Sequence, residues 1–242
     1  MKIPVGCMQC IEEGLNITSF PMINNINEED VYEITCEYGH KNYFCIQNEK
    51  FDILFTLAIQ ALSEGYYREA VLNFTSALER FYEFGIKLML KINKVDQENI
   101  ALFYKEVSKF SERELGAYAS LYLLTRKIPP KLLSGTKRSF RNDIVHGGIS
   151  PKYEKVVDYG KTVHELIKND YLFFKKNYAI NMINANLDRR SRLAAPNGYP
   201  IGTCLITSYI EKECPIEDMI DDINDLNLFV NNIEQLPIVP LN

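Results

Sequence analysis

The chain has 242 residues, of which 46% are hydrophobic and 24% are charged. That length allows a hydrophobic core of ordinary size, so the whole chain does not need disulfides or metals in order to fold. The formal net charge is -5, and an even spread of that charge would argue against a nucleic-acid partner. We find no apolar run long enough to cross a bilayer and no signal-peptide pattern, so we expect a cytoplasmic protein with reduced thiols and no membrane partner.

Two pairs of potential metal ligands stand near the N-terminus. Cys7 and Cys10 form one CxxC pair, and Cys36 and His40 form a second pair. A zinc ion takes four nitrogen or sulfur ligands in a tetrahedron, and two such pairs brought together provide them. With four protein ligands no position remains for a reacting water, so the sequence predicts a structural zinc. Cys45 is an alternative to His40 as fourth ligand, but its place inside a strand favours a core thiol.

The residues around the second pair have the pattern of a β-hairpin. Residues 31–35 and 42–46 alternate on either side of a Tyr38-Gly39 turn. The ligands would then lie at the hairpin tip, as in proteins that resemble zinc ribbons. We therefore expect a zinc-ribbon-like module over residues 1–49, with a loop over its polar segment 11–30.

The middle of the chain, residues 50–178, has helical periodicity. Apolar side chains recur there at three- and four-residue steps, which is typical of amphipathic helices. Glycines, prolines and polar runs divide this region, and the helices are expected at about 51–63, 66–92, 97–110, 111–127, 136–146 and 151–178. Short connections between six helices favour an antiparallel bundle. The fold class is therefore mainly α.

The remaining residues, 179–242, are predicted to be an α/β extension. A strand is expected over residues 203–210 and an acidic helix over 215–233. The Arg189–Arg192 segment is a basic cluster, either an RNA contact or a surface linker. His164, in the last long helix of the bundle, is expected on the helix surface.

Charge is distributed unevenly along the sequence. Residues 125–176 carry 12 basic and 5 acidic side chains, whereas 207–242 carry 1 basic and 8 acidic ones. A local basic region inside an acidic protein is the pattern of a phosphate-binding surface. The alternative is a solvated helix face. If the acidic helix lay against the basic region, it would mask that region.

The basic region contains the sequence Arg141-Asn142-Asp143-Ile144-Val145-His146. An Arg followed by a polar residue, with a His five positions after the Arg, resembles the motif of HEPN domains. A second similarity is the run from Glu64 to Leu72 that continues to Glu79, which resembles an early long helix of these domains. The resemblance covers about residues 50–178. HEPN domains are helical bundles found in RNA-cleaving toxins, abortive-infection proteins and CRISPR effectors.

The same residue types suit RNA cleavage without a metal. Such cleavage needs a group that moves protons at neutral pH, which a histidine provides, and a cation that holds the phosphate. His146 would be the general base or acid, and Arg141 the phosphate clamp. Side chains five residues apart on a helix diverge by about 140°, so Arg141 and His146 converge only on a distorted helix or where two copies meet. The resemblance implies the second arrangement, a composite site in a homodimer.

Further residues have expected roles in this site. The resemblance implies that Asn142 orients the histidine or a phosphate oxygen. Glu79 would pair with Arg141, and Lys137 and Arg138 would guide the RNA backbone. The resemblance implies an endoribonuclease of antiviral defence or of a toxin system, with a possible antitoxin or defence partner. The alternative is a non-catalytic RNA- or protein-binding module in which His146 only interacts with its helix dipole.

Overall fold

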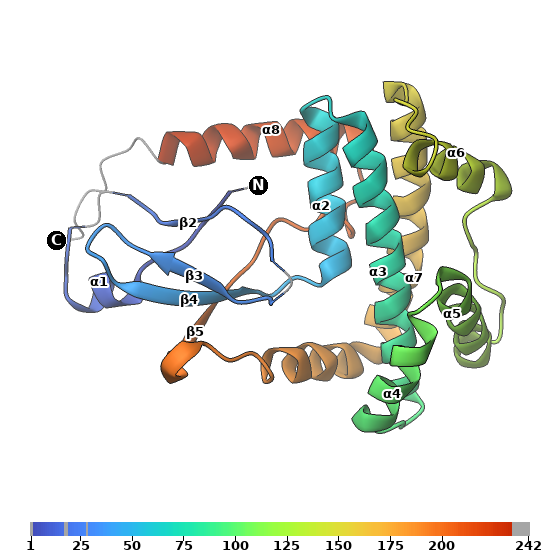
Figure 1. Ribbon diagram of the computed structural model, residues 1–242, viewed down its shortest axis with the longest axis horizontal. Coiled ribbons are helices and arrows are strands. Elements are labelled where there is room, and N and C mark those ends of the chain that lie inside the picture. Colours follow the sequence, from blue (N-terminus) through green and yellow to red (C-terminus); the bar gives the residue numbers. More distant parts are fainter. Residues whose placement is uncertain (1, 17–18, 28, 234–242) are drawn as a thin grey trace.

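The computed structural model describes residues 2–16, 19–27 and 29–233 of the chain. Within these ranges it contains eight α-helices, one short 3-10 helix (Pro196–Gly198) and two small sheets. The prediction of a mainly helical protein is therefore confirmed. Figure 1 shows α2, α3 and the first part of α7 standing side by side, with α5 and α6 on one side and the strands on the other. None of the described helices is both long and apolar enough to cross a membrane.

The bundle helices lie close to their predicted positions, because apolar periodicity determines them. Their bounds are α2 Lys50–Ser63, α3 Tyr67–Ile92, α4 Gln97–Val107, α5 Ser111–Arg126, α6 Gly135–Val145 and α7 Tyr153–Arg190. Helix α3 is central and contacts α2, α4, α5, α6 and α7. The core between them is rich in fully buried aromatic rings, among them Phe55, Phe74, Tyr118 and Tyr159.

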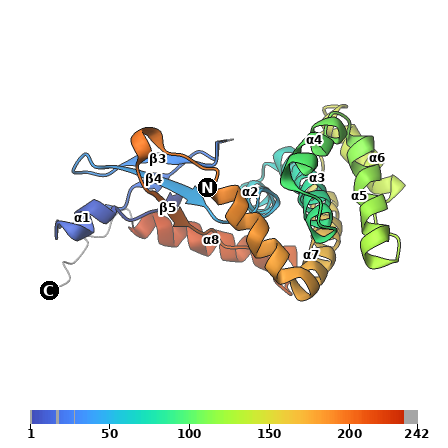
Figure 2. The same cartoon turned by 90° about the horizontal axis from the view of Figure 1, so that it is seen from below.

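Helix α7 bends at Tyr178, the residue at which the bundle was predicted to end. Tyr178 has non-helical backbone angles, with φ -137° and ψ 32°. The residues after it leave the bundle and run toward the strands (Figures 1 and 2). We call residues 179–192 the α7 arm.

The strands join the two ends of the chain. Strands β1 (Ile3–Pro4) and β2 (Met22–Ile23) pair antiparallel in one sheet. In the other sheet, β3 (Tyr32–Thr35) and β4 (Lys41–Ile46) form the predicted hairpin, and β5 (Ile201–Cys204) lies parallel to β4. The prediction of a loop over 11–30 is wrong at β2 and at residues 11–12, which end the short helix α1 (Met8–Glu12). Elements of two and five residues are too short to show a period. The strand predicted over 203–210 ends at Cys204.

Beyond β5 the chain is extended but is bound by side chains of the bundle. The Asn48 amide oxygen accepts a hydrogen bond from Ile206 N at 2.9 Å. Asp52 accepts one from Ser208 Oγ at 2.9 Å, and Thr56 Oγ1 donates to Thr207 O at 3.2 Å. These bonds replace the ladder of a strand, which is why the alternating pattern there misled the prediction.

His164 takes part in the same attachment. Its side chain is buried, and Nε2 lies 3.0 Å from Tyr209 O and 3.1 Å from Ile210 O. Burial lowers the pKa of this imidazole, which favours the neutral ring. The expectation of a surface histidine is therefore wrong. Residue 164 is four positions after Gly160 and three before Ile167, on the buried face of α7.

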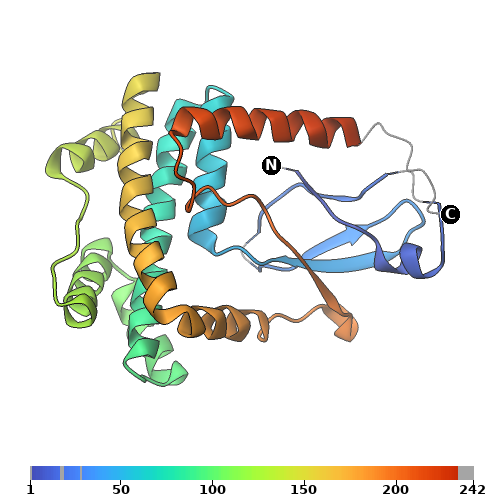
Figure 3. The same cartoon turned by 180° about the vertical axis from the view of Figure 1, so that it is seen from behind.

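Helix α8 (Ile216–Ile233) starts against the bundle and extends beside the strands, as the view from behind shows (Figure 3). Its first residue lies over Gly160 of α7. A Cβ built on Gly160 would be 2.8 Å from Ile216 Cδ1 and 2.8 Å from two atoms of the Phe74 ring. Real Cβ atoms do not approach so closely, so glycine is needed for this contact of three helices.

Replacing Gly160 with alanine is expected to destabilise the fold by about 1–3 kcal/mol. The Phe74 ring is fully buried and cannot retreat. Gly116→Ala is the matched control, because a Cβ at this helical position meets nothing within 4 Å. There the change is expected to stabilise by about 0.5–1 kcal/mol. Urea unfolding of both variants measures the difference, and equal effects would contradict the close packing.

Candidate functional site

The four predicted metal ligands lie together. Cys7 precedes α1 (Met8–Glu12) as its N-cap and Cys10 lies within it, whereas Cys36 and His40 come from the tip of the β3–β4 hairpin. Cys10 Sγ is 3.5 Å from Cys36 Sγ and 3.3 Å from His40 Nδ1, and Cys7 Sγ is 3.7 Å from the same nitrogen. Ligands at zinc distances in a tetrahedron are separated by about 3.3–3.8 Å. The cluster therefore has the size and the donor set that could hold such an ion.

Neighbouring groups orient these ligands. Glu13 Oε2 lies 3.5 Å from His40 Nε2, so the other ring nitrogen faces the sulfurs. Asn42 Nδ2 donates to Cys7 Sγ at 3.2 Å. A carboxylate beside the outer ring nitrogen and an amide donor to a sulfur are outer contacts of the kind that orient a histidine and support a thiolate at metal sites. A group of unrelated buried thiols would not require such outer contacts.

The thiols also have an electrostatic reason to bind a cation. Burial raises the pKa of Cys7, but hydrogen bonds from Cys10 N and Asn42 outweigh it and lower that pKa to about 6. Burial and the adjacent sulfurs of Cys7 and Cys36 raise the pKa of Cys10 to about 12. A second negative charge is therefore unfavourable here unless a cation balances it.

Cys45 does not belong to this cluster. It lies in β4 and is 2% exposed. Among the described residues, the group that could hold a metal ion consists of Cys7, Cys10, Cys36 and His40. Of the two alternatives for the fourth ligand, the geometry favours His40.

The second predicted site lies on α6. The Arg141 guanidinium donates through Nη2 to Glu79 Oε1 of α3 at 2.7 Å, and through Nη1 to Asn142 Oδ1 at 3.0 Å. The expected pairing of Glu79 with Arg141 is thus present. Because Arg141 is half-buried and bonded on two sides, its side chain is held in one orientation.

His146 lies at the C-terminal end of the same helix. Its N–H donates to Asn142 O at 2.9 Å, and its backbone angles stay in the helical region at φ -102° and ψ -31°. Helix α6 is therefore regular, and His146 diverges from Arg141 by about 140°. The His146 side chain is exposed and forms no hydrogen bond or ion pair with the described residues. A single chain does not bring the two groups to one point.

The two basic residues predicted to guide RNA differ from each other. Lys137 Nζ donates to the Asp158 carboxylate and to Asp158 O, the latter at 3.0 Å, and so ties α6 to α7. Arg138 is exposed and makes no ion pair with the described part of the chain. Of these two, Arg138 alone can meet a phosphate without first breaking an ion pair.

The acidic C-terminal region pairs with lysines of α7, which belong to the basic region 125–176 but lie outside α6. Lys161, Lys168 and Lys175 lie seven residues apart on α7 and pair respectively with Glu217 at 2.9 Å, Glu213 at 2.8 Å and Glu211 at 2.6 Å. Glu211 and Glu213 precede α8, and Glu217 is in its first turn. These carboxylates bind α7 and leave the α6 residues uncovered.

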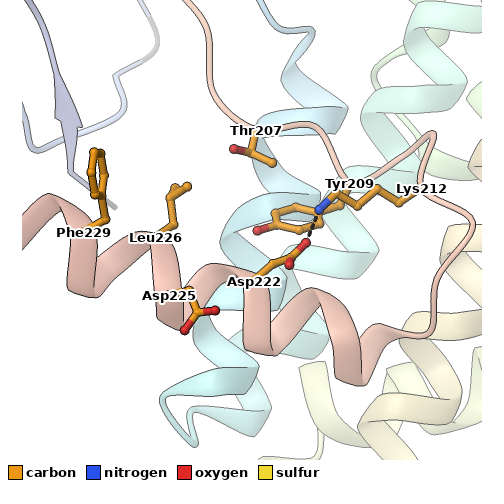
Figure 4. A pocket seen from close by; sticks show the side chains of 7 residues that line it. All are labelled: Thr207, Tyr209, Lys212, Asp222, Asp225, Leu226 and Phe229. Atoms are coloured by element: carbon orange, nitrogen blue, oxygen red, sulfur yellow. Dashed lines mark hydrogen bonds and ion pairs between the residues drawn. The ribbon is translucent and has the colours of Figure 1, made fainter.

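The structure also has two surface pockets that the sequence did not predict. The smaller, about 290 Å³, lies between α8 and the extended segment that follows β5 (Figure 4). Its Asp222 is already bonded to Lys212. The larger, about 950 Å³, is a cleft bordered by α2, α3, α4 and the α7 arm, and Glu79 is in its wall. Its wall also includes Ile26, Asn27 and Asp30 from the segment between β2 and β3. Because its residues come from segments far apart in the sequence, no local motif marks it.

The Arg189–Arg192 cluster is partly structural. Arg189 Nη2 donates to the carbonyl oxygens of Gln47 and Asn48 at 3.0 and 3.2 Å and so holds the α7 arm to the end of β4. The exposed Arg192 is in the wall of the large cleft. Neither a surface linker nor a simple RNA contact describes the whole segment.

Comparison of the chain with protein-family models, with curated proteins and with solved structures gave no match. The chemistry of these two sites is therefore the basis for assigning a function.

Proposed function

We propose that the protein is a metal-independent endoribonuclease of the HEPN type. The observation that supports this best is the fixed guanidinium of Arg141, held by Glu79 beside Asn142, on the helix that ends at the exposed His146. A bidentate cation suits a phosphate, and an accessible imidazole suits proton transfer near neutral pH. The motif resemblance described above points to the same reaction.

The reaction would be an attack of the ribose 2′-oxygen on the adjacent phosphorus. The new 2′-O–P bond forms while the P–O5′ bond breaks, which gives a cyclic phosphate and a free 5′-hydroxyl. In a homodimer, His146 of one copy would take the 2′-hydroxyl proton and His146 of the second copy would protonate the leaving 5′-oxygen. Arg141 would balance the charge that grows on the phosphate. Because Arg141 and His146 diverge on one helix, two copies of the chain would supply the groups together, in a homodimer.

The N-terminal cluster would hold a structural zinc in this enzyme. Four protein ligands complete the coordination of that ion, so it would stabilise the module and leave catalysis to α6. The module would contribute to recognition of RNA or of a partner protein. The biological setting would be antiviral defence or a toxin system, with an antitoxin or defence protein as partner.

Purified protein incubated with single-stranded RNA in EDTA is expected to cleave it, and His146→Asn is expected to slow cleavage by about 10²–10⁴-fold. Arg141→Lys should also slow it, because lysine lacks the bidentate fork. Lys176→Ala, an exposed change elsewhere on α7, is the control that retains full activity. Zinc content is measured in the same samples, since EDTA also reaches the N-terminal cluster.

A second candidate is a non-catalytic RNA-binding module of the same fold. The Glu79 contact favours it, because an arginine already paired with a carboxylate has a structural use. Equal behaviour of the wild type and His146→Asn in the cleavage assay, with RNA still bound, would select this candidate. A size measurement that finds only monomers at active concentrations would contradict the composite site.

A further inference from the structure

The large cleft next to Arg141 has the shape of a ligand site. Its volume of about 950 Å³ is at the upper end of the usual range for pockets that bind small molecules. On α3 its wall includes Ser76 and Glu79, and it extends past Lys91 to the α7 arm at Arg192. Arg141 is not in the wall but binds the carboxylate of Glu79. Glu79 therefore links the proposed phosphate clamp to one end of the cleft, and Arg192 lies at the other end.

The charges along the cleft leave a positive surplus. Among the described residues, its wall has seven basic and five acidic side chains. Glu83 is shared by Arg80 and Lys87, and Asp30 by Lys50 at 4.0 Å and Arg189 at 3.9 Å. One carboxylate facing two cations leaves a net positive charge in its surroundings. The whole-chain charge of -5 does not show this.

Two cations of the wall are particularly available. Lys105 of α4 is exposed and makes no ion pair with the described residues. Arg192 is exposed as well. The carboxylate near it, Asp188, is attracted by the charge of Arg192 but forms its ion pair with Lys91, at 2.5 Å. Both residues lie in the wall of the cleft and outside α6, Lys105 on α4 and Arg192 just after the end of α7.

The apolar part of the wall supplies flat surfaces. Phe84 and Tyr104 are half-buried in it, and Leu88 and Ile100 are buried beside them. Lys87 Nζ lies 4.3 Å from the centre of the Tyr104 ring, so a cation and an aromatic ring meet there. Aromatic rings next to basic side chains are what unpaired nucleotides bind, through stacking and phosphate contacts.

We propose that this cleft binds the single-stranded RNA that flanks the scissile phosphate. This inference rests on the proposed ribonuclease function, because it places the strand from Arg141 along α3 to Lys105 and Arg192. A duplex would present its phosphates but would hide the base faces from Phe84 and Tyr104. The cleft therefore selects unpaired RNA.

The test measures binding separately from cleavage. In a His146→Asn background, the affinity for a labelled unstructured RNA of about 12 nucleotides is measured by fluorescence anisotropy at several salt concentrations. Lys105→Glu and Arg192→Glu are each expected to raise Kd by about tenfold or more. Each should also reduce the dependence of log K on log salt by about 0.7. The matched control is Lys176→Glu, which has the same charge change on an exposed lysine outside the cleft.

The outcomes separate the two proposals. If both cleft variants bind RNA as tightly as their background while wild-type protein cleaves and His146→Asn does not, the cleft assignment is overturned and the nuclease stands. If the cleft variants lose binding but the wild type never cleaves, the nuclease fails and the RNA cleft stands. Tighter binding of duplex RNA than of the single strand, or no RNA binding by any form, overturns the cleft assignment.

Discussion

Replacing Cys10 with serine is expected to release zinc from the N-terminal module and to unfold it. Cys10 has the shortest contacts in the cluster, to Cys36 Sγ and His40 Nδ1, so its loss leaves a three-ligand site open to water. Binding free energy in structural zinc sites is folding free energy, and the loss is expected to be several kcal/mol. Zinc is expected to fall from one equivalent per chain to a small fraction, as measured by elemental mass spectrometry.

The control for this change is Cys45→Ala. Cys45 is equally buried but lies outside the ligand group, so zinc content should not change. Loss of zinc from Cys45→Ala with retention in His40→Ala would instead make Cys45 the fourth ligand. Absence of zinc from wild-type protein purified under reducing conditions would contradict the metal prediction itself.

Asp52→Asn is expected to stabilise the protein at neutral pH. Burial raises the pKa of Asp52 from its ordinary 3.8 to about 6, against the opposing hydrogen bonds from Asn48 and Ser208. The asparagine side chain has the same shape. Its oxygen can accept the Asn48 bond, and its amide can donate to the Ser208 hydroxyl. The substitution therefore removes a buried charge and keeps both contacts.

The sign of the pH dependence follows from the raised pKa. Below pH 3.8 the carboxyl is protonated in the folded and unfolded chains, so the wild type and Asp52→Asn have nearly equal stability. Between pH 3.8 and about 6 the unfolded chain ionises while the folded carboxyl keeps its proton, so the stability of the wild type falls as the pH rises. The difference amounts to about 3 kcal/mol above pH 7 in favour of Asp52→Asn.

Urea unfolding between pH 4 and pH 8 measures this difference. Asp143→Asn removes the same charge from an exposed position of α6 and should change stability by less than about 0.5 kcal/mol. If the difference in stability between wild type and Asp52→Asn does not grow with pH, ionisation of the buried Asp52 does not reduce the free energy of unfolding.

Elements with a long apolar period were predictable from the sequence. The helices of the bundle and the β3–β4 hairpin follow from such periods. The four residues of the possible metal site could be predicted as well, because cysteine and histidine pairs at this spacing are a restrictive pattern and each pair is local in the sequence. Glu79 is near Arg141 as expected.

What could not be predicted depends on contacts between distant elements. Strand β2 has two residues and no period. Residues 205–210 alternate as a strand does, but Asn48, Asp52 and Thr56 bind this segment through its backbone and the Ser208 hydroxyl. Lys137 is a basic residue of the kind that contacts phosphates, but its side chain is bound to Asp158 of α7. The large cleft exists only after three helices, the α7 arm and the segment before β3 have met.

The parallel pairing of β5 with β4 has a consequence for how the chain folds. Tyr43 pairs with Ile201, so the intervening bundle must be synthesised before this edge of β4 can be covered. Until then β4 presents unpaired backbone groups, which is the feature that promotes association between chains. Such a distant closure also slows folding. A nascent or truncated chain that stops before Ile201 is therefore expected to aggregate through β4, and the full chain is protected once its last strand arrives.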